Sequence, residues 1–235
     1  MHFAEIDRLA NGTYSSIHSA RVLSKFIFTV FMISAFIISN RVEFTLALLG
    51  VILFLFWLGA VPFKTVANLA LYPLFFSSIF ALMELRSSTI GALMIIIRAV
   101  GAALTLVLLI TTTPYTDLFS FLSLWLPKIL IDTFMFTYRS VFILLDRLSN
   151  LMKSMKLRGG YSSFNIFKNM KNIAGALGVL IITSFDMSER MHKIYSLRGY
   201  KEGGIRSEIE LFPLRGGDYF LFLLGFSSLL GGFIL

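Results

Sequence analysis

Apolar runs long enough to cross a lipid bilayer constrain this chain more than any other feature. A helical crossing needs about 20 predominantly apolar residues, or as few as ~17. Five stretches meet this requirement: Val22–Ser39, Phe44–Ala60, Val66–Met83, Ile90–Thr112 and Tyr219–Leu235. No strand-like alternation of apolar and polar residues competes with them. We therefore predict an all-α, polytopic membrane protein with about five transmembrane helices.

The composition also points to lipid as the solvent for much of the chain. Apolar residues make up 57% of it and charged residues 14%, against roughly 25% charged in an ordinary soluble domain. A soluble fold of 235 residues has too little interior to hide so much apolar surface. The absence of cysteine excludes a disulfide scaffold and any cysteine-based zinc or iron–sulfur site.

The net charge of +8 is concentrated in one region. Residues Asp146–Arg206 contain eleven Lys and Arg against four Asp and Glu. In a membrane protein such an excess marks a cytoplasmic segment, and we prefer this interpretation to nucleic-acid binding. Counting the spans back from this region places the N-terminus in the cytoplasm and the C-terminus outside. We expect a multi-pass protein of the cell (plasma or inner) membrane, with no nucleic-acid partner.

Four regions follow from this topology. Residues 1–21 form a cytoplasmic N-terminal segment, 22–112 carry four transmembrane helices, 113–218 form a cytoplasmic or interfacial domain, and 219–235 form the C-terminal transmembrane helix. The third region is amphipathic, and its longest apolar run is about ten residues, too short to span. Helices are predicted there at Thr116–Leu124, Pro127–Leu157, Ser163–Thr183 and Asp186–Leu197, the last with a capping-box-like start.

A short sequence recurs in the basic region. Leu157, Arg158 and Gly159 reappear forty residues later as Leu197, Arg198 and Gly199. Each copy ends an amphipathic helix, with glycine where a left-handed residue is favoured and arginine where the helix dipole favours a cation. One copy alone would indicate an ordinary capped helix. Two copies indicate two helix tips, each presenting an arginine to a groove of another protein.

These paired tips resemble the two arginine-centred motifs in the transmembrane T component (EcfT/CbiQ type) of energy-coupling factor (ECF) ABC transporters. Other segments match that family in order along almost the whole chain. They are Ile17–Lys25, Thr112–Leu118, Leu126-Pro127, Thr137–Arg139 and Met187–Arg190. Two positions depart from the family pattern, since Ser19-Ala20 replace Asp-Pro and Ser140 replaces a tyrosine.

The resemblance implies a non-catalytic coupling subunit. In that family the tips dock into two ABC ATPase subunits, which hold ATP and Mg²⁺, and a separate S component binds the substrate. Leu157–Gly159 and Leu197–Gly199 would then be the ATPase-coupling residues. The segments Ile6–Ala10 and Ser16–His18 resemble the cobalt/nickel branch. The alternatives are the vitamin branch and a stand-alone secondary transporter, which would need inverted repeats and mid-membrane acidic residues.

Sites for chemistry on this chain itself are not evident. It has no Gly-rich phosphate loop, no Gly-x-Ser-x-Gly and no His-Glu-x-x-His sequence, so we predict no catalytic residue, bound cofactor or metal site. Arg98 interrupts the fourth apolar stretch. A cation within a span is a functional candidate by default, but we favour a structural role, with Glu84 as a possible partner.

Overall fold

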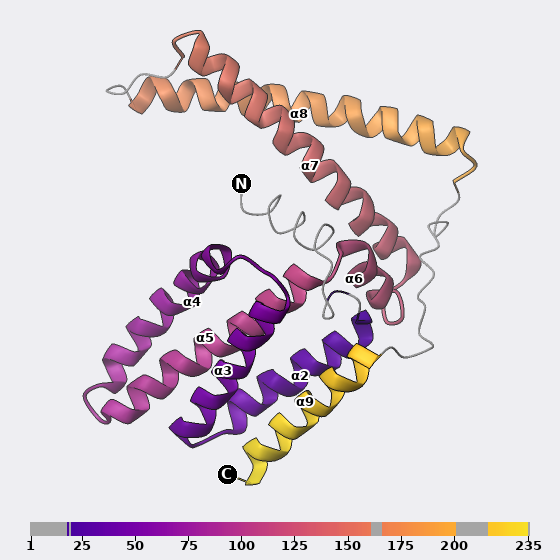
Figure 1. Cartoon of the computed structure of the whole chain (residues 1–235). Coiled ribbons are helices and arrows are strands. Elements are labelled where there is room, and N and C mark those ends of the chain that lie inside the picture. The colour runs from indigo at the N-terminus through magenta and orange to yellow at the C-terminus, as the bar shows by residue number, and fades with distance from the viewer. Residues whose placement is uncertain (1–17, 19, 161–165, 201–215, 235) are drawn as a thin grey trace. The chain divides into compact units, whose positions relative to one another are not determined.

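A computed structural model describes residues 18, 20–160, 166–200 and 216–234 of the chain. The regular secondary structure of these residues is entirely α-helical, which confirms the predicted fold class. Figure 1 labels the helices in chain order. Their bounds are α2 Val22–Ile38, α3 Val42–Leu58, α4 Phe63–Glu84, α5 Thr89–Thr112, α6 Tyr115–Leu122, α7 Lys128–Leu157, α8 Ile166–Leu197 and α9 Gly216–Ile234.

Two compact units make up the chain. The first comprises Met1–Phe121 and Glu208–Leu235, and therefore contains α2 to α6 and α9. The second comprises Leu122–Ser207 and contains α7 and α8. The chain thus leaves the first unit at the end of α6 and returns to it before α9.

Helix α2 is central to the first unit. It packs against α9, α5 and α3, and Figure 1 shows α9 running alongside it. Phe28, Met32, Ala35 and Phe36 are enclosed almost completely. They follow the i, i+4, i+7, i+8 spacing of a single helix face. Helix α4 packs mainly against α5.

Small residues allow these helices to approach closely. A Cβ atom on Gly101 in α5 would lie 2.4 Å from Cζ of Phe36 in α2. A Cβ atom on Gly232 in α9 would lie 3.4 Å from the carbonyl oxygen of Ala35, and Ser228 on the same helix is buried. Such residues let backbones pack tightly within membranes. These small residues of α5 and α9 therefore serve packing within the chain.

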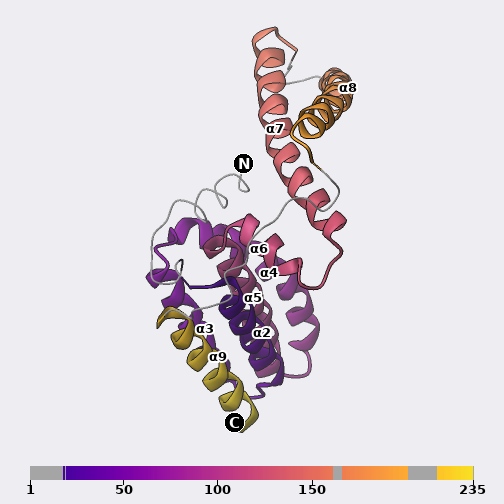
Figure 2. The same ribbon diagram turned by 90° about the vertical axis from the view of Figure 1, so that its right-hand side faces the viewer.

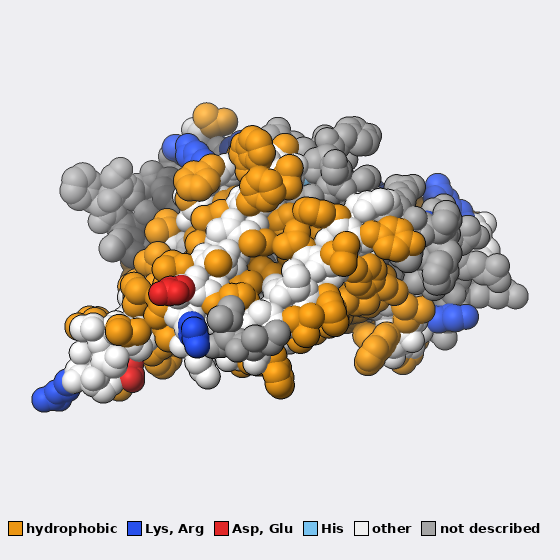
Figure 3. All heavy atoms as spheres, turned by 60° about the horizontal axis from the view of Figure 1, so that its bottom comes forward, with side chains coloured by type: hydrophobic (Ala, Val, Ile, Leu, Met, Phe, Trp, Pro, Cys, Tyr) orange, Lys and Arg blue, Asp and Glu red, His pale blue; other side chains and the backbone are white. Residues whose placement is uncertain are grey.

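The outer surface of the first unit is rich in large apolar side chains. Figure 3 shows hydrophobic side chains spread over the visible face with few charges among them. Among the described helices, α4, α5, α9 and residues Phe167–Leu197 of α8 are long and apolar enough to cross a membrane. Helices α2 and α3 are apolar but have 17 residues each. The chain is therefore a multi-pass membrane protein, whereas the expected number of five spans stays a prediction.

Helices α7 and α8 of the second unit cross each other, as Figures 1 and 2 show. Helix α7 ends at Leu157, as predicted. The predicted break after Thr183, with a new helix from Asp186, is wrong, because α8 continues through both residues. The hydroxyls of Thr183 and Ser184 donate to carbonyls four and three residues before them, at 2.6 and 2.7 Å. These hydroxyls therefore bond within the helix instead of capping a new one.

Candidate functional site

The first Leu-Arg-Gly sequence forms the end of α7. Arg158 is the C-cap residue, and Gly159 follows it with φ +68°. The amide of Gly160 donates to the carbonyl of Met155 at 2.8 Å, and the amide of Gly159 donates to that of Lys156 at 3.2 Å. These two bonds define a Schellman motif, which satisfies carbonyls that a helix end leaves unpaired.

The end of α8 repeats this geometry. Gly199 has φ +71°. The amide of Tyr200 donates to the carbonyl of Tyr195, and the amide of Gly199 donates to that of Ser196, both at 3.0 Å. Glycine adopts positive φ without the steric cost that a Cβ atom brings. The predicted left-handed glycine at the end of each helix is therefore confirmed.

The leucine and arginine of each tip project into solvent. Leu157 is 89% exposed and Leu197 is 88% exposed, and both arginines are exposed. Within the described residues, neither Arg158 nor Arg198 forms a side-chain hydrogen bond or ion pair. A solvated leucine gains none of the stabilisation that burial gives. Each tip therefore offers a partner one apolar side chain and one cation whose planar fork matches a carboxylate.

Each tip is held by a side-chain hydrogen bond to the other helix. Asn172 of α8 donates through Nδ2 to the carbonyl of Gly160 at 2.6 Å. The hydroxyl of Tyr200 donates to a carboxylate oxygen of Asp132, a buried residue near the start of α7. Sequence reasoning did not select these supports, because they join residues 12 and 68 positions apart.

The two tips lie at opposite ends of the crossed pair, as Figure 1 shows. The first tip is bonded to Asn172, and the second begins 25 residues further along the same helix, at Leu197. At the α-helical rise of about 1.5 Å per residue, roughly 37 Å of helix separates them. The two tips are therefore far apart along α8.

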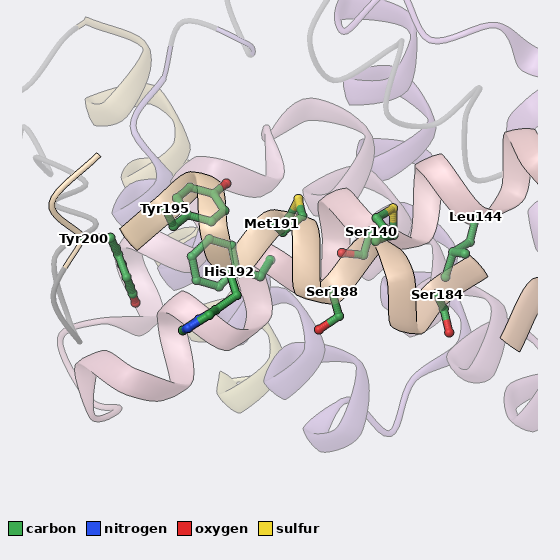
Figure 4. Close-up of a pocket in the computed structure, with 10 residues that line it drawn as sticks. Ser140, Leu144, Ser184, Ser188, Met191, His192, Tyr195 and Tyr200 are labelled. Atoms are coloured by element: carbon green, nitrogen blue, oxygen red, sulfur yellow. The ribbon is translucent and has the colours of Figure 1, made fainter. Parts of the chain in front are cut away.

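An open groove of about 360 Å³ lies between α7 and α8. Figure 4 shows Tyr195, Tyr200 and His192 toward one end and Leu144 and Ser184 toward the other. Apolar and hydroxyl-bearing side chains form most of its lining. Among the described residues there is no group of three His, Cys, Asp or Glu that could hold a metal ion.

Comparison with the sequence models of protein families assigns the chain to one family. The sequence model of one family, described as CbiQ, cobalt transport protein, matches residues 12–209. The chain belongs to the CbiQ family. The match covers well over half of the sequence and includes both helix tips, which confirms the resemblance to a T component of the CbiQ type. A search of curated proteins finds no match. This CbiQ-family chain is therefore a component of a transport system.

Arg98 of the CbiQ-family chain stabilises a helix end. Its guanidinium donates to the carbonyl of Ser39, the C-cap residue of α2, and to Oδ1 of Asn40 at 3.4 Å. A cation is favoured where helix carbonyls end unpaired. Glu84, the suggested partner, instead accepts a hydrogen bond from the Ser87 hydroxyl at 2.6 Å. The suggested partner Glu84 is therefore wrong, because Arg98 bonds to the connection between α2 and α3, and its structural role stays a prediction.

A second polar cluster lies where α2 begins. Lys25 is buried, and its Nζ donates to the carbonyl of Thr112, the last residue of α5, at 2.7 Å. Asp218 of α9 is completely buried and accepts a hydrogen bond from the amide of Arg21 at 2.8 Å. Two segments that carry the family resemblance meet here. Sequence reasoning missed Lys25 and Asp218 as site residues, although each is a charge at the start of an apolar helix.

Proposed function

We propose that this chain is the T subunit of an ECF-type ABC importer. It transmits ATP-driven motion of two ATPase subunits to a separate S component that binds the transported metal. The observation that carries the proposal is the pair of exposed Leu-Arg-Gly tips at opposite ends of α7 and α8. The family description supports Co²⁺ as the cargo, with Ni²⁺ as the second candidate within the same branch.

The tips have the chemistry of docking points. Burying Leu157 or Leu197 in a partner groove contributes about 1.5–3 kcal/mol each. Arg158 and Arg198 add charge-assisted hydrogen bonds to an acidic groove, which are stronger than neutral ones. The separation of roughly 37 Å along α8 suits one tip on each of two ATPase subunits. Closure of the ATPase pair on ATP would then displace both tips.

Helix α8 also carries an apolar face that suits a membrane-embedded partner. Leu177, Ile181 and Phe185 form an i, i+4, i+8 stripe, and all three are exposed. The apolar run Ile173–Ile182 is about 15 Å long at the helical rise, about half of the ~30 Å hydrocarbon core. Although α8 as a whole is long and apolar enough to cross a membrane, we infer from this short run that α8 lies along the membrane interface and offers the stripe to the S component. The basic residues of the same region favour the cytoplasmic side.

The proposal is tested by charge reversal at the tips. We would produce Arg158→Glu, Arg198→Glu and the double variant with an affinity tag, together with the partner ATPases and S component. Arg147→Glu is the matched control, because Arg147 is also exposed on α7 but lies away from its tip. The measurements are ATPase retention on the tagged chain, Co²⁺ uptake and retention of the S component.

Losing one partner of a desolvated charge pair costs about 2–5 kcal/mol, and a reversed charge adds repulsion. Each single variant should therefore weaken ATPase retention and abolish uptake, and the double variant should lose the ATPases. The S component should stay bound in all of them, and Arg147→Glu should behave as the wild type. A double variant that retains both ATPases and transports normally would overturn the proposal.

A further inference from the structure

The chain passes between its two units at two places, after α6 and before α9. A displacement of the second unit that reaches the first through the backbone must pass through these two connections. In the first unit, both connections are fastened to one element, the N-terminal turns of α2. We call residues Arg21–Phe26 the α2 joint.

The outgoing connection is fastened by two side chains of the α2 joint. Lys25 donates to the carbonyl of Thr112 at the end of α5, where the helix dipole favours a cation. The ring of Phe26 packs on the ring of Phe121, with centroids 4.7 Å apart. Phe121 is the last residue of the first unit before the chain crosses to the second. Asp117 of α6 also acts electrostatically on the Lys25 ammonium.

The returning connection is fastened by one carboxylate. Asp218 lies in the first turn of α9, and its Oδ1 accepts the amide of Arg21, the N-cap residue of α2. An anion is favoured at that end of a helix. Asp218 also acts electrostatically on Lys25. Lys25 therefore fastens the outgoing connection to α2, and Asp218 fastens the returning connection to the same end of α2.

We propose that the α2 joint delivers the displacement of the second unit to the transmembrane helices, with Lys25 and Asp218 as its positioning residues. This inference rests on the proposed coupling function. The rest of α2 supports it, because Met32, Ala35 and Phe36 are enclosed by α3, α5 and α9. A tightly packed helix transmits a shift at its N-terminus along its length instead of absorbing it.

The test compares metal uptake with ATP hydrolysis in the complete complex. Lys25→Met removes the cation, Lys25→Arg keeps it, and Asp218→Asn keeps an acceptor without the charge. Lys64→Met is the control, because Lys64 is exposed at the start of α4. We expect Lys25→Met to retain the ATPases and their hydrolysis, while Co²⁺ uptake per ATP hydrolysed falls about tenfold, within the range of mutations that alter coupling between sites.

The remaining variants separate positioning from folding. Lys25→Arg should restore most of the uptake per ATP, Asp218→Asn should reduce it, and Lys64→Met should leave it unchanged. Normal uptake per ATP in Lys25→Met, or equal losses of uptake and hydrolysis, would contradict the joint. If Lys25→Met does not fold, a normal ratio in Asp218→Asn contradicts the joint and a reduced ratio supports it. A wild-type chain that retains no ATPase would instead contradict the proposed function itself.

Discussion

Replacing Gly199 by alanine isolates the contribution of the tip geometry to docking. Gly199 has φ +71°, and a Cβ atom there would meet no other atom within 4 Å. The cost of alanine is therefore purely conformational, about 1–2 kcal/mol for an L-residue in the left-handed region. We expect the free Gly199→Ala tip to relax from the positive φ and docking to restore it, so that this cost is spent on binding. Since 1.4 kcal/mol corresponds to a factor of ten, the affinity of the second tip for its ATPase should fall about five- to thirtyfold.

The assay is a titration of purified ATPase against the membrane-embedded chain, with two reference variants. Gly199→Asn should bind more tightly than Gly199→Ala, because asparagine tolerates positive φ better. Gly178→Ala makes the same substitution inside α8, where a Cβ also meets no other atom within 4 Å. There alanine favours the helix by about 0.5–1 kcal/mol. Wild-type affinity in Gly199→Ala, or an equal loss in Gly178→Ala, would refute the reasoning.

Three further outcomes are expected. Tyr200→Phe removes the hydroxyl that donates to buried Asp132, at a cost of about 1–3 kcal/mol. Photo-cross-linking of the second tip to an ATPase subunit should therefore weaken, while cross-linking of the first tip is unaffected. An equal loss at both tips would contradict this. Gly101→Ala places a Cβ atom 2.4 Å from Phe36, so thermal unfolding in detergent should show a loss of about 1–3 kcal/mol, and an unchanged midpoint would contradict the packing. Ser87→Cys should react with an impermeant maleimide from outside, and Lys153→Cys should not; the reverse pattern would contradict the orientation.

Local features were predictable from the sequence. The apolar stretches form helices because, in lipid, a helix pairs its backbone N–H and C=O groups by hydrogen bonds within the same segment. The ends at Gly159 and Gly199 were predictable because a Schellman motif depends on a few adjacent residues. Both features depend on residues that are close together in the sequence, so a sequence pattern can predict them.

Features that depend on distant contacts were not predictable. Lys25 and Thr112 are 87 positions apart, and Arg21 and Asp218 are 197 apart, so no spacing rule connects them. Arg98 donates to the backbone carbonyl of Ser39 at the end of α2. Every residue has such a carbonyl, so no sequence pattern identifies this partner. The continuity of α8 was missed for another reason, because Asp186 with Glu189 three residues later matches a capping box, whereas both residues lie inside one continuous helix.

Site-specific cross-linking tests the central claim most directly. The chain has no cysteine, so a single cysteine at Leu157 or Leu197 can carry a photoactivated cross-linker in the assembled, ATP-hydrolysing complex. Val141, exposed in the middle of α7, is the control position. The account requires Leu157→Cys and Leu197→Cys each to form a covalent product with an ATPase subunit, and Val141→Cys to form none. An active complex in which neither tip cross-links to an ATPase would contradict it.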